Sequence, residues 1–181
     1  ASDVYKRQPL KDDEIDFHPK CSKKFFGTEV TPQLDFGLED IEKLAIKVLG
    51  KSISLTGVQP KLSVEITKSE KGAKRLTIVG LWGNFILKPP FPKYPEMPEI
   101  EDLTMHLAEE IGIKSAEHSL IRLKSGELAY ISKRFDRLKS EKLHVEDMAQ
   151  ITETLTERKY SGSMEKVGKA ILNYSSFAGN D

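Results

Sequence analysis

The sequence predicts an α+β fold in which a mixed antiparallel sheet is flanked by helices. Apolar and polar residues alternate over 61–67, which is typical of a half-buried strand, and two further strands are expected over 75–79 and 84–88. Apolar residues recur at three-to-four spacing before and after these runs, which is typical of amphipathic helices. The length of 181 residues allows one domain, or one domain and a small lobe.

The first predicted helix spans 38–49 and ends at Gly50, a residue type that commonly follows a helix. Short polar loops join the three strands that follow, so we expect an antiparallel meander. Prolines concentrated over 89–98 predict a stiff linker without regular structure.

A helix is predicted beyond this linker at 100–111, because its apolar residues fall on one face. A β-hairpin should follow, with strands 119–123 and 127–133. Two further helices are expected, one over 146–155 and one that begins after Ser163 as its N-cap.

The organisation expected from these elements has four parts. Residues 1–15 are set aside as a scar-like or disordered start, and 16–50 form an N-terminal segment with a helix. A nucleotide-binding sheet lobe over 51–137 and the helical start of a C-terminal lobe over 138–181 complete the chain.

The net charge and the composition of the chain argue against nucleic-acid and membrane partners. The chain has 28 Lys and Arg against 28 Asp and Glu, so its formal net charge is zero and a direct nucleic-acid partner is disfavoured. It has no apolar run long enough for a membrane span and only one cysteine, Cys21. We therefore expect a cytoplasmic protein with no membrane partner.

Two segments carry candidate phosphate chemistry. The loop 51–61 mixes hydroxyls, a glycine and a final lysine, and its backbone N–H groups could hold phosphates. Lys88 ends a predicted strand before an acidic helix start, where Glu99, Glu101 and Asp102 are candidate partners. The alternatives are loop serines that only satisfy backbone groups and a solvated lysine at a strand end.

One pair of residues suggests a metal. His18 and Cys21 have zinc-finger-like spacing, but a closed zinc site needs four ligands. Only two are visible here, so free surface residues are the expected interpretation and no metal site is assigned.

Several motifs, taken together and in order, resemble one family. They are Ser52-Ile53-Ser54, Gly57-Val58-Gln59-Pro60-Lys61-Leu62-Ser63, Phe85-Ile86-Leu87-Lys88-Pro89-Pro90, Gly126-Glu127-Leu128-Ala129-Tyr130 and Lys133-Arg134-Phe135-Asp136-Arg137. The set resembles the HipA-like serine/threonine kinases of bacterial toxin–antitoxin systems, and its start resembles the short HipT branch.

The resemblance implies a protein-kinase-like N-lobe that uses ATP and magnesium. Gly57, Val58, Gln59, Pro60 and Lys61 would form the nucleotide loop, and Lys88 would reach the ATP phosphates. The hinge whose backbone reads adenine would be Lys133, Arg134 and Phe135. Ser54 matches the serine that the family autophosphorylates, and Ser52 matches the second such serine of the short branch.

The resemblance also implies a substrate and partners, and this chain departs from the family pattern in two respects. The protein substrate would be an aminoacyl-tRNA synthetase, and the partners a DNA-binding antitoxin and a small HipS-like protein. The catalytic and metal-binding aspartates would lie beyond Asp181, so this chain alone is expected to be inactive. Short-branch members carry a cysteine pair just before the His18 position that is missing here. The competing hypothesis is a non-catalytic nucleotide- or partner-binding module, a pseudokinase or an adaptor.

Overall fold

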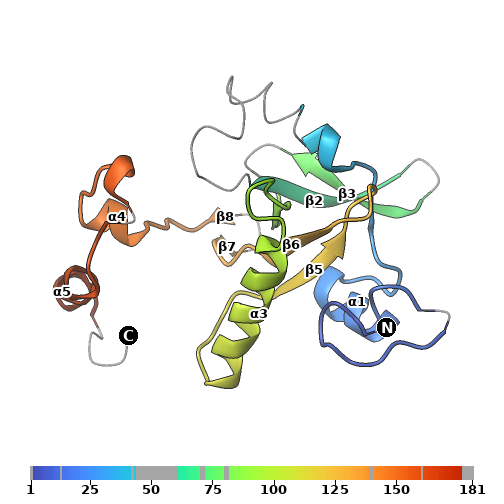
Figure 1. Cartoon of the computed structure of the whole chain (residues 1–181), viewed down its shortest axis with the longest axis horizontal. Helices are drawn as coiled ribbons and strands as arrows, with labels where there is room; N and C mark the ends of the chain where they lie inside the picture. Colours follow the sequence, from blue (N-terminus) through green and yellow to red (C-terminus); the bar gives the residue numbers. More distant parts are fainter. Residues whose placement is uncertain are drawn as a thin grey trace. The chain divides into compact units, whose positions relative to one another are not determined.

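The computed structural model describes residues 2–12, 14–41, 43, 61–69, 72–79, 82–138, 141–159 and 161–176. The chain forms two compact units, Ala1–Phe135 and Asp136–Asp181, which are taken separately below. Both contain helix and strand, in agreement with the α+β class (Figure 1). Within the described residues, no helix is long and apolar enough to cross a membrane.

The first unit is built on a six-stranded sheet in the order β1-β3-β2-β4-β6-β5. The bounds are β1 Gln33–Leu34, β2 Leu62–Lys68, β3 Lys74–Val79, β4 Phe85–Lys88, β5 His118–Arg122 and β6 Leu128–Lys133. β1 runs parallel to β3 and all other pairs are antiparallel, so the sheet is mixed. The predicted strands are all present, with ends shifted by one residue or so.

The expected meander of the first three strands is wrong, because β2 and not β3 lies in the middle. β4 pairs with β2, as in the register Leu62↔Leu87, and the chain must cross the end of β2 to reach this place. Gly83 makes the crossing possible, since a Cβ there would lie 2.5 Å from the backbone oxygen of Val64. The Gly83 N–H also donates to Ser63 Oγ at 3.0 Å.

Helix α3, Met97–Glu110, packs on β5 and β6. It begins inside the predicted proline linker, with Pro98 in its first turn, where a proline costs no helical hydrogen bond. The apolar residues that predicted it, such as Leu103 and Leu107, are more than half exposed, whereas Asp102 is fully buried. The inward side of the helix therefore carries Pro98, Asp102 and Met105 and not the predicted apolar stripe.

Residues of the segment 1–15, predicted to be a scar-like or disordered start, contribute to the core of this unit. Val4 and Tyr5 are buried, and the Val4 carbonyl accepts hydrogen bonds from Ser119 Oγ at 3.0 Å and from the Leu120 N–H at 3.4 Å. The segment thus lies along β5, which is an edge strand of the sheet.

Helix α1, Pro19–Phe26, was not predicted from the sequence. It starts with a proline in its first turn and ends at Gly27, whose φ of 71° lies in the left-handed region that favours glycine. Phe25 and Phe26 are buried and contact the Phe85 ring of β4, with ring centroids 5.8 and 5.9 Å apart. The predicted helix over 38–49 is described only at its start, where 38–41 and 43 are helical.

The second unit contains the hairpin of β7, Arg137–Leu138, and β8, Glu141–Lys142, followed by α4, Met148–Ile151, a 3-10 helix, Thr156–Arg158, and α5, Met164–Tyr174. The helix predicted over 146–155 is thus much shorter. Asp147 caps α4 by accepting from the Gln150 N–H at 2.9 Å. Ser163 caps α5 as predicted, and its Oγ accepts from the Lys166 N–H at 3.2 Å.

Candidate functional site

Lys88 lies at the end of β4, where its side chain meets both α3 and β6. Its ammonium forms an ion pair with Glu101 of α3. It also lies 5.3 Å from the ring centroid of Tyr130, the residue opposite Lys88 in the β4–β6 register. The Lys88 and Glu101 side chains are 28% and 25% exposed, so the pair is largely shielded from solvent. The pairing of Lys88 with a glutamate of the next helix, one of three candidates named from the sequence, is therefore present.

The ring of Tyr130 lies under the Lys88 ammonium of this ion pair. Tyr130 is 2% exposed, and its ring stacks on His118 with centroids 5.8 Å apart. Burial raises the pKa of its phenol well above the usual range, and the charges of Glu101, Asp102 and Glu109 act in the same direction. Tyr130 thus stays neutral at physiological pH and presents a ring face that attracts the ammonium above it.

The start of β2 lies beside Lys88. Leu62 is opposite Leu87 in the β2–β4 register, so Lys61 and Lys88 are each one residue beyond that pair. Lys61, the last residue of the predicted nucleotide loop, is exposed. Ser52, Ser54 and 57–60, which the sequence assigns to that loop, lie outside the described residues. The structure therefore places only the point where the loop joins the sheet, and that point is next to Lys88.

The predicted hinge begins at the other end of the β4–β6 pairing, with the last residue of β6. Lys133 is opposite Phe85, and its Nζ pairs with Glu117 at 2.6 Å. The N–H groups of Lys133 and Arg134 already donate to the carbonyls of Glu117 and Asn84, at 2.8 and 2.9 Å. Phe135 is 72% exposed and ends the first unit. A hinge here would have to recognise adenine through other backbone groups, such as carbonyl oxygens.

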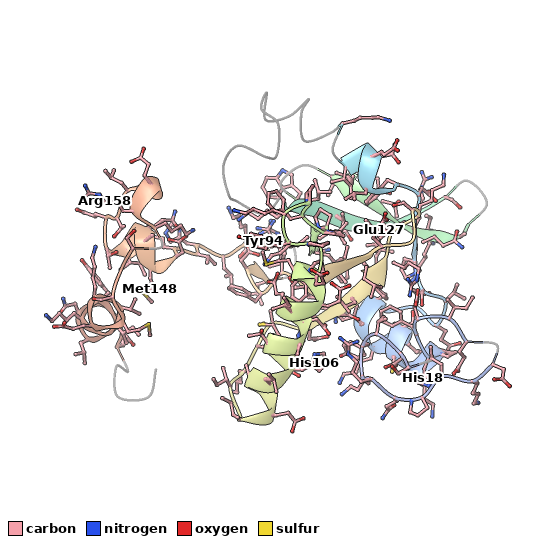
Figure 2. The ribbon with its side chains drawn as sticks, viewed as in Figure 1. His18, Tyr94, His106, Glu127, Met148 and Arg158 are labelled. Carbon is pink, nitrogen blue, oxygen red and sulfur yellow. The ribbon has the colours of Figure 1, made fainter. Side chains whose placement is uncertain are left out.

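Two further clusters bring together side chains that can bind metals. His18 lies 2.8 Å through Nδ1 from Oδ2 of buried Asp3, and Cys21 completes this group. Asp3 was not anticipated, because residues 1–15 were set aside. The second cluster joins Asp102 and His106 of α3 (Figure 2) to His118 of β5. Its sequence signal was the i,i+4 spacing of Asp102 and His106, which places both on one face of a helix.

The first of these clusters shifts the pKa values of its members. The Asp3 hydrogen bond, opposed by burial, raises the pKa of His18. Burial, with the Asp3 hydrogen bond and charge, raises the pKa of the Cys21 thiol to about 11. Burial opposes ionisation of Asp3 itself, but hydrogen bonds from Cys21, His18 and two backbone N–H groups outweigh it and lower the pKa. Cys21 is therefore a protonated thiol at neutral pH.

The comparisons with a family model and with known proteins point to the same protein family. A family model described as "HipA-like C-terminal domain" matches residues 53–180. The chain is 32% identical over 130 residues to a protein of Sinorhizobium fredii named "Putative kinase Y4dM", and the match covers 65% of this chain and 32% of that protein. It is 35% identical over 103 residues to a Haemophilus influenzae protein named "Putative kinase", with 54% and 29% covered. The chain thus spans about a third of the length of each relative.

Proposed function

We propose, from the premise that this chain belongs to the family of HipA-like C-terminal domains, that it forms the nucleotide-binding part of an ATP-dependent serine/threonine protein kinase. The observation that carries the proposal is the ion pair between Lys88 of β4 and Glu101 of α3. In protein kinases a strand lysine that contacts the nucleotide phosphates is held by a glutamate of the neighbouring helix. Both sequence relatives also bear the name of kinase.

Lys88 suits this role because three constraints hold its ammonium in place. Glu101 accepts from it, Tyr130 lies beneath it, and the strand fixes its backbone. An ammonium has three N–H donors, so pairing with one carboxylate leaves donors for an anionic phosphate oxygen. A charge that is already oriented needs no reorganisation when negative charge develops on the transferred group.

The remaining roles follow the order of the chain. Residues 57–61 would hold phosphates through backbone N–H groups beside Lys88, and 133–135 would border the adenine. A nucleotide that touched both would have to lie along β4, because Lys88 and Phe85, the register partner of Lys133, are at its two ends. Magnesium would neutralise phosphate charge. We assign no magnesium ligand among the described residues, since Glu101 is committed to Lys88.

We extend the proposal to a toxin kinase of a toxin–antitoxin system, with an aminoacyl-tRNA synthetase as its substrate and a DNA-binding antitoxin and a small HipS-like protein as partners. Autophosphorylation of Ser52 or Ser54 would regulate it. A phosphoserine carries about −1.5 to −2 charges at neutral pH, so it would oppose an anionic nucleotide in the same loop. Mass spectrometry of the active full-length protein after incubation with ATP would detect the modification.

Nucleotide binding by the purified chain tests the core of the proposal. A fluorescent ATP analogue should bind and be displaced by ATP. Lys88→Ala should weaken this binding, whereas Lys68→Ala, which removes an exposed lysine from the end of β2, should leave it unchanged. Equal affinities of the two variants would remove Lys88 from the site.

Phosphoryl transfer by the full-length protein then separates a kinase from a non-catalytic module. Loss of one electrostatic donor typically costs about 10²- to 10³-fold in kcat. Lys88→Ala should therefore lower kcat by about that factor while the protein stays folded. A full-length protein that binds nucleotide but transfers no phosphate to any serine or threonine would be the pseudokinase or adaptor of the competing hypothesis.

A further inference from the structure

We propose that Asp102, His106 and His118 form a binding site for a divalent transition metal of the zinc class. The three residues come from α3 and from the first position of β5, and all belong to the first unit. The site is distinct from Lys88 and the predicted nucleotide loop, so it stands or falls independently of the proposed kinase function.

The spacing of the donor atoms suits such an ion. His118 Nε2 lies 3.0 Å from His106 Nδ1 and 3.8 Å from Asp102 Oδ1, the carboxylate oxygen that is proposed to ligate. Zinc binds imidazole nitrogen and carboxylate oxygen at roughly 2.0–2.2 Å, which puts neighbouring donors of a tetrahedral site about 3.3 Å apart. Shifts of about half an ångström would bring both distances to this value, and one ligand atom of each of the three residues lies within 4.8 Å of the others.

Asp102 keeps one carboxylate oxygen, Oδ1, without a hydrogen bond although Arg7 pairs with the other. The Asp102 side chain is fully buried, and Oδ1 is shielded from solvent. An unpaired buried carboxylate oxygen is costly, because it has lost its water without replacement. Helix α3 nevertheless turns this residue and His106 inward and leaves Leu103 and Leu107 exposed. Ligation of a metal gives a physical reason for this orientation.

The second nitrogen of each histidine is already held by a backbone carbonyl. His118 Nδ1 lies 3.1 Å from the Ala116 oxygen, and His106 Nε2 lies 3.2 Å from the Tyr5 oxygen. In the metal-bound state these two atoms would carry the N–H groups, which leaves His118 Nε2 and His106 Nδ1 to face the metal. Carbonyl partners of this kind commonly orient metal-bound histidines.

Two existing contacts would change when the metal binds. His106 Nδ1 also lies 2.8 Å from the Asp102 carbonyl, so the ring must turn away from this oxygen. The His106 proton would then lie on Nε2, where it can donate to the Tyr5 carbonyl. Arg7 pairs with Asp102 Oδ2, and this leaves Oδ1 as the oxygen that is free to ligate.

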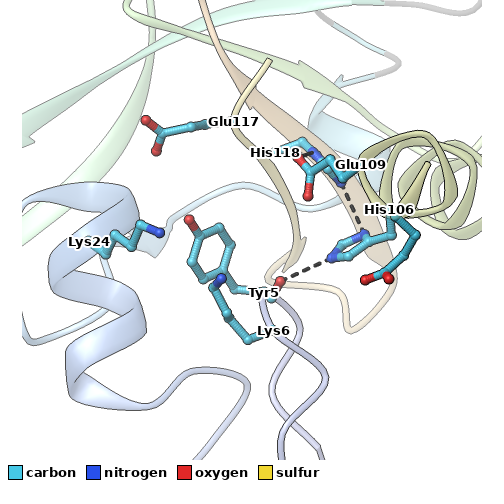
Figure 3. Close-up of a pocket in the computed structure, with 8 residues that line it drawn as sticks. Tyr5, Lys6, Lys24, His106, Glu109, Glu117 and His118 are labelled. Atoms are coloured by element: carbon cyan, nitrogen blue, oxygen red, sulfur yellow. Dashed lines mark hydrogen bonds and ion pairs between the residues drawn. The ribbon is translucent and has the colours of Figure 1, made fainter. Parts of the chain in front are cut away.

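A cavity of about 360 Å³ provides access (Figure 3). His106 and His118 both line it, together with Glu109, Glu110 and Glu117. Lys6 and Lys24 line the cavity as well, so three carboxylates face two ammonium groups and the balance favours a cation slightly. Water there could supply the fourth ligand of a tetrahedral ion.

Metal binding would cross-link α3 to β5 one residue away from Glu101. It would thereby fix the helix that holds the partner of Lys88. This consequence rests on the proposed nucleotide site, whereas the metal site does not.

Zinc titration of the EDTA-treated chain against a chromophoric chelator tests the site. We expect one zinc ion per chain, a higher melting temperature with zinc, and at least about 10-fold weaker binding in His106→Gln and His118→Gln, since even the loss of an outer-shell partner costs 10- to 100-fold. The controls His18→Gln and Cys21→Ser remove ligands of the other cluster and should retain this ion. His144→Gln, which alters an exposed histidine, should retain it as well.

Cobalt in place of zinc adds a spectroscopic distinction. Tetrahedral Co²⁺ at this site should show d–d absorption without a thiolate charge-transfer band, because no cysteine takes part. His118 is 2% exposed, so its substitution could unfold the chain; His106 is 28% exposed, and His106→Gln should keep a native circular dichroism spectrum while it loses the ion. The proposal is overturned if the wild-type chain binds no zinc, if folded His106→Gln binds it unchanged, or if Cys21→Ser alone abolishes binding.

Discussion

Replacing Glu101 by glutamine tests whether the ion pair with Lys88 holds α3 against the sheet. The change keeps the shape of the side chain and removes its charge. It leaves the Lys88 ammonium over the Tyr130 ring but without its carboxylate partner. The free energy of unfolding should therefore decrease.

The expected size follows from the burial of the pair. Exposed ion pairs contribute about 0.2–1 kcal/mol, whereas breaking a fully buried pair costs about 3–5 kcal/mol. The Lys88 and Glu101 side chains are 28% and 25% exposed, which places them between these limits. We expect a coupling of about 1–2 kcal/mol, larger than for a surface pair because less water screens the charges.

A double-mutant cycle with Lys88→Met and Glu101→Gln isolates this coupling, because the loss of other contacts cancels in the cycle. Urea unfolding followed by far-ultraviolet circular dichroism gives the free energies of unfolding for the cycle. The control pair Lys23–Glu29 has a 2.9 Å contact, but its side chains are 66% and 65% exposed. It should show a coupling of no more than about 0.5 kcal/mol. Equal couplings for the two pairs would refute the reasoning.

Three other measurements examine features away from Lys88. Gly83→Ala should destabilise the chain by about 1–3 kcal/mol, because the new Cβ would lie 2.5 Å from a β2 carbonyl oxygen. Gly168→Ala in α5 places its Cβ in open space and should not destabilise the chain. Equal urea midpoints for the two variants would contradict this expectation. Iodoacetamide at pH 8 should modify Cys21 about 100-fold more slowly in the folded chain than in the chain unfolded by guanidinium, because the folded structure raises the pKa of this thiol to about 11. Similar rates in the two states would rule out a shielded thiol. The hydrogen bond from Asp3 raises the pKa of His18, so the stability it contributes is complete below about pH 6.5 and is lost as the pH rises through the folded-state pKa. The stability difference between the wild type and His18→Gln should therefore be larger at pH 6 than at pH 8.5, and a difference independent of pH would show that the pair carries no charge.

Local patterns in the sequence were sufficient to predict most elements but not their neighbours. Alternation identified the strands 62–68 and 74–79, because it reports which side chains face the core. It does not say which strand lies beside which, and the order β3-β2-β4 depends on the close approach of Gly83 to β2. A glycine that permits a crossing looks the same in sequence as one that permits a turn.

The site shows the same division between local and tertiary information. Lys88 and its helix glutamate could be proposed from sequence, since both lie on adjacent elements. The orientation of α3 could not, because the periodicity of Leu103 and Leu107 predicts an inward apolar face. In the structure that face is exposed, and the inward positions carry Glu101 and Asp102.

The segment that contains Val4 has a consequence for solubility. β5 ends the six-stranded sheet, and an edge strand with unpaired N–H groups can recruit a strand from another molecule. The Val4 carbonyl occupies the Leu120 N–H and the neighbouring Ser119 hydroxyl, and four of the five residues of β5 are buried. The N-terminal residues thus cover the edge strand and prevent a strand of another molecule from pairing with it. Recombinant forms that begin after Pro9 should aggregate more readily than the intact chain even where their secondary structure is unchanged.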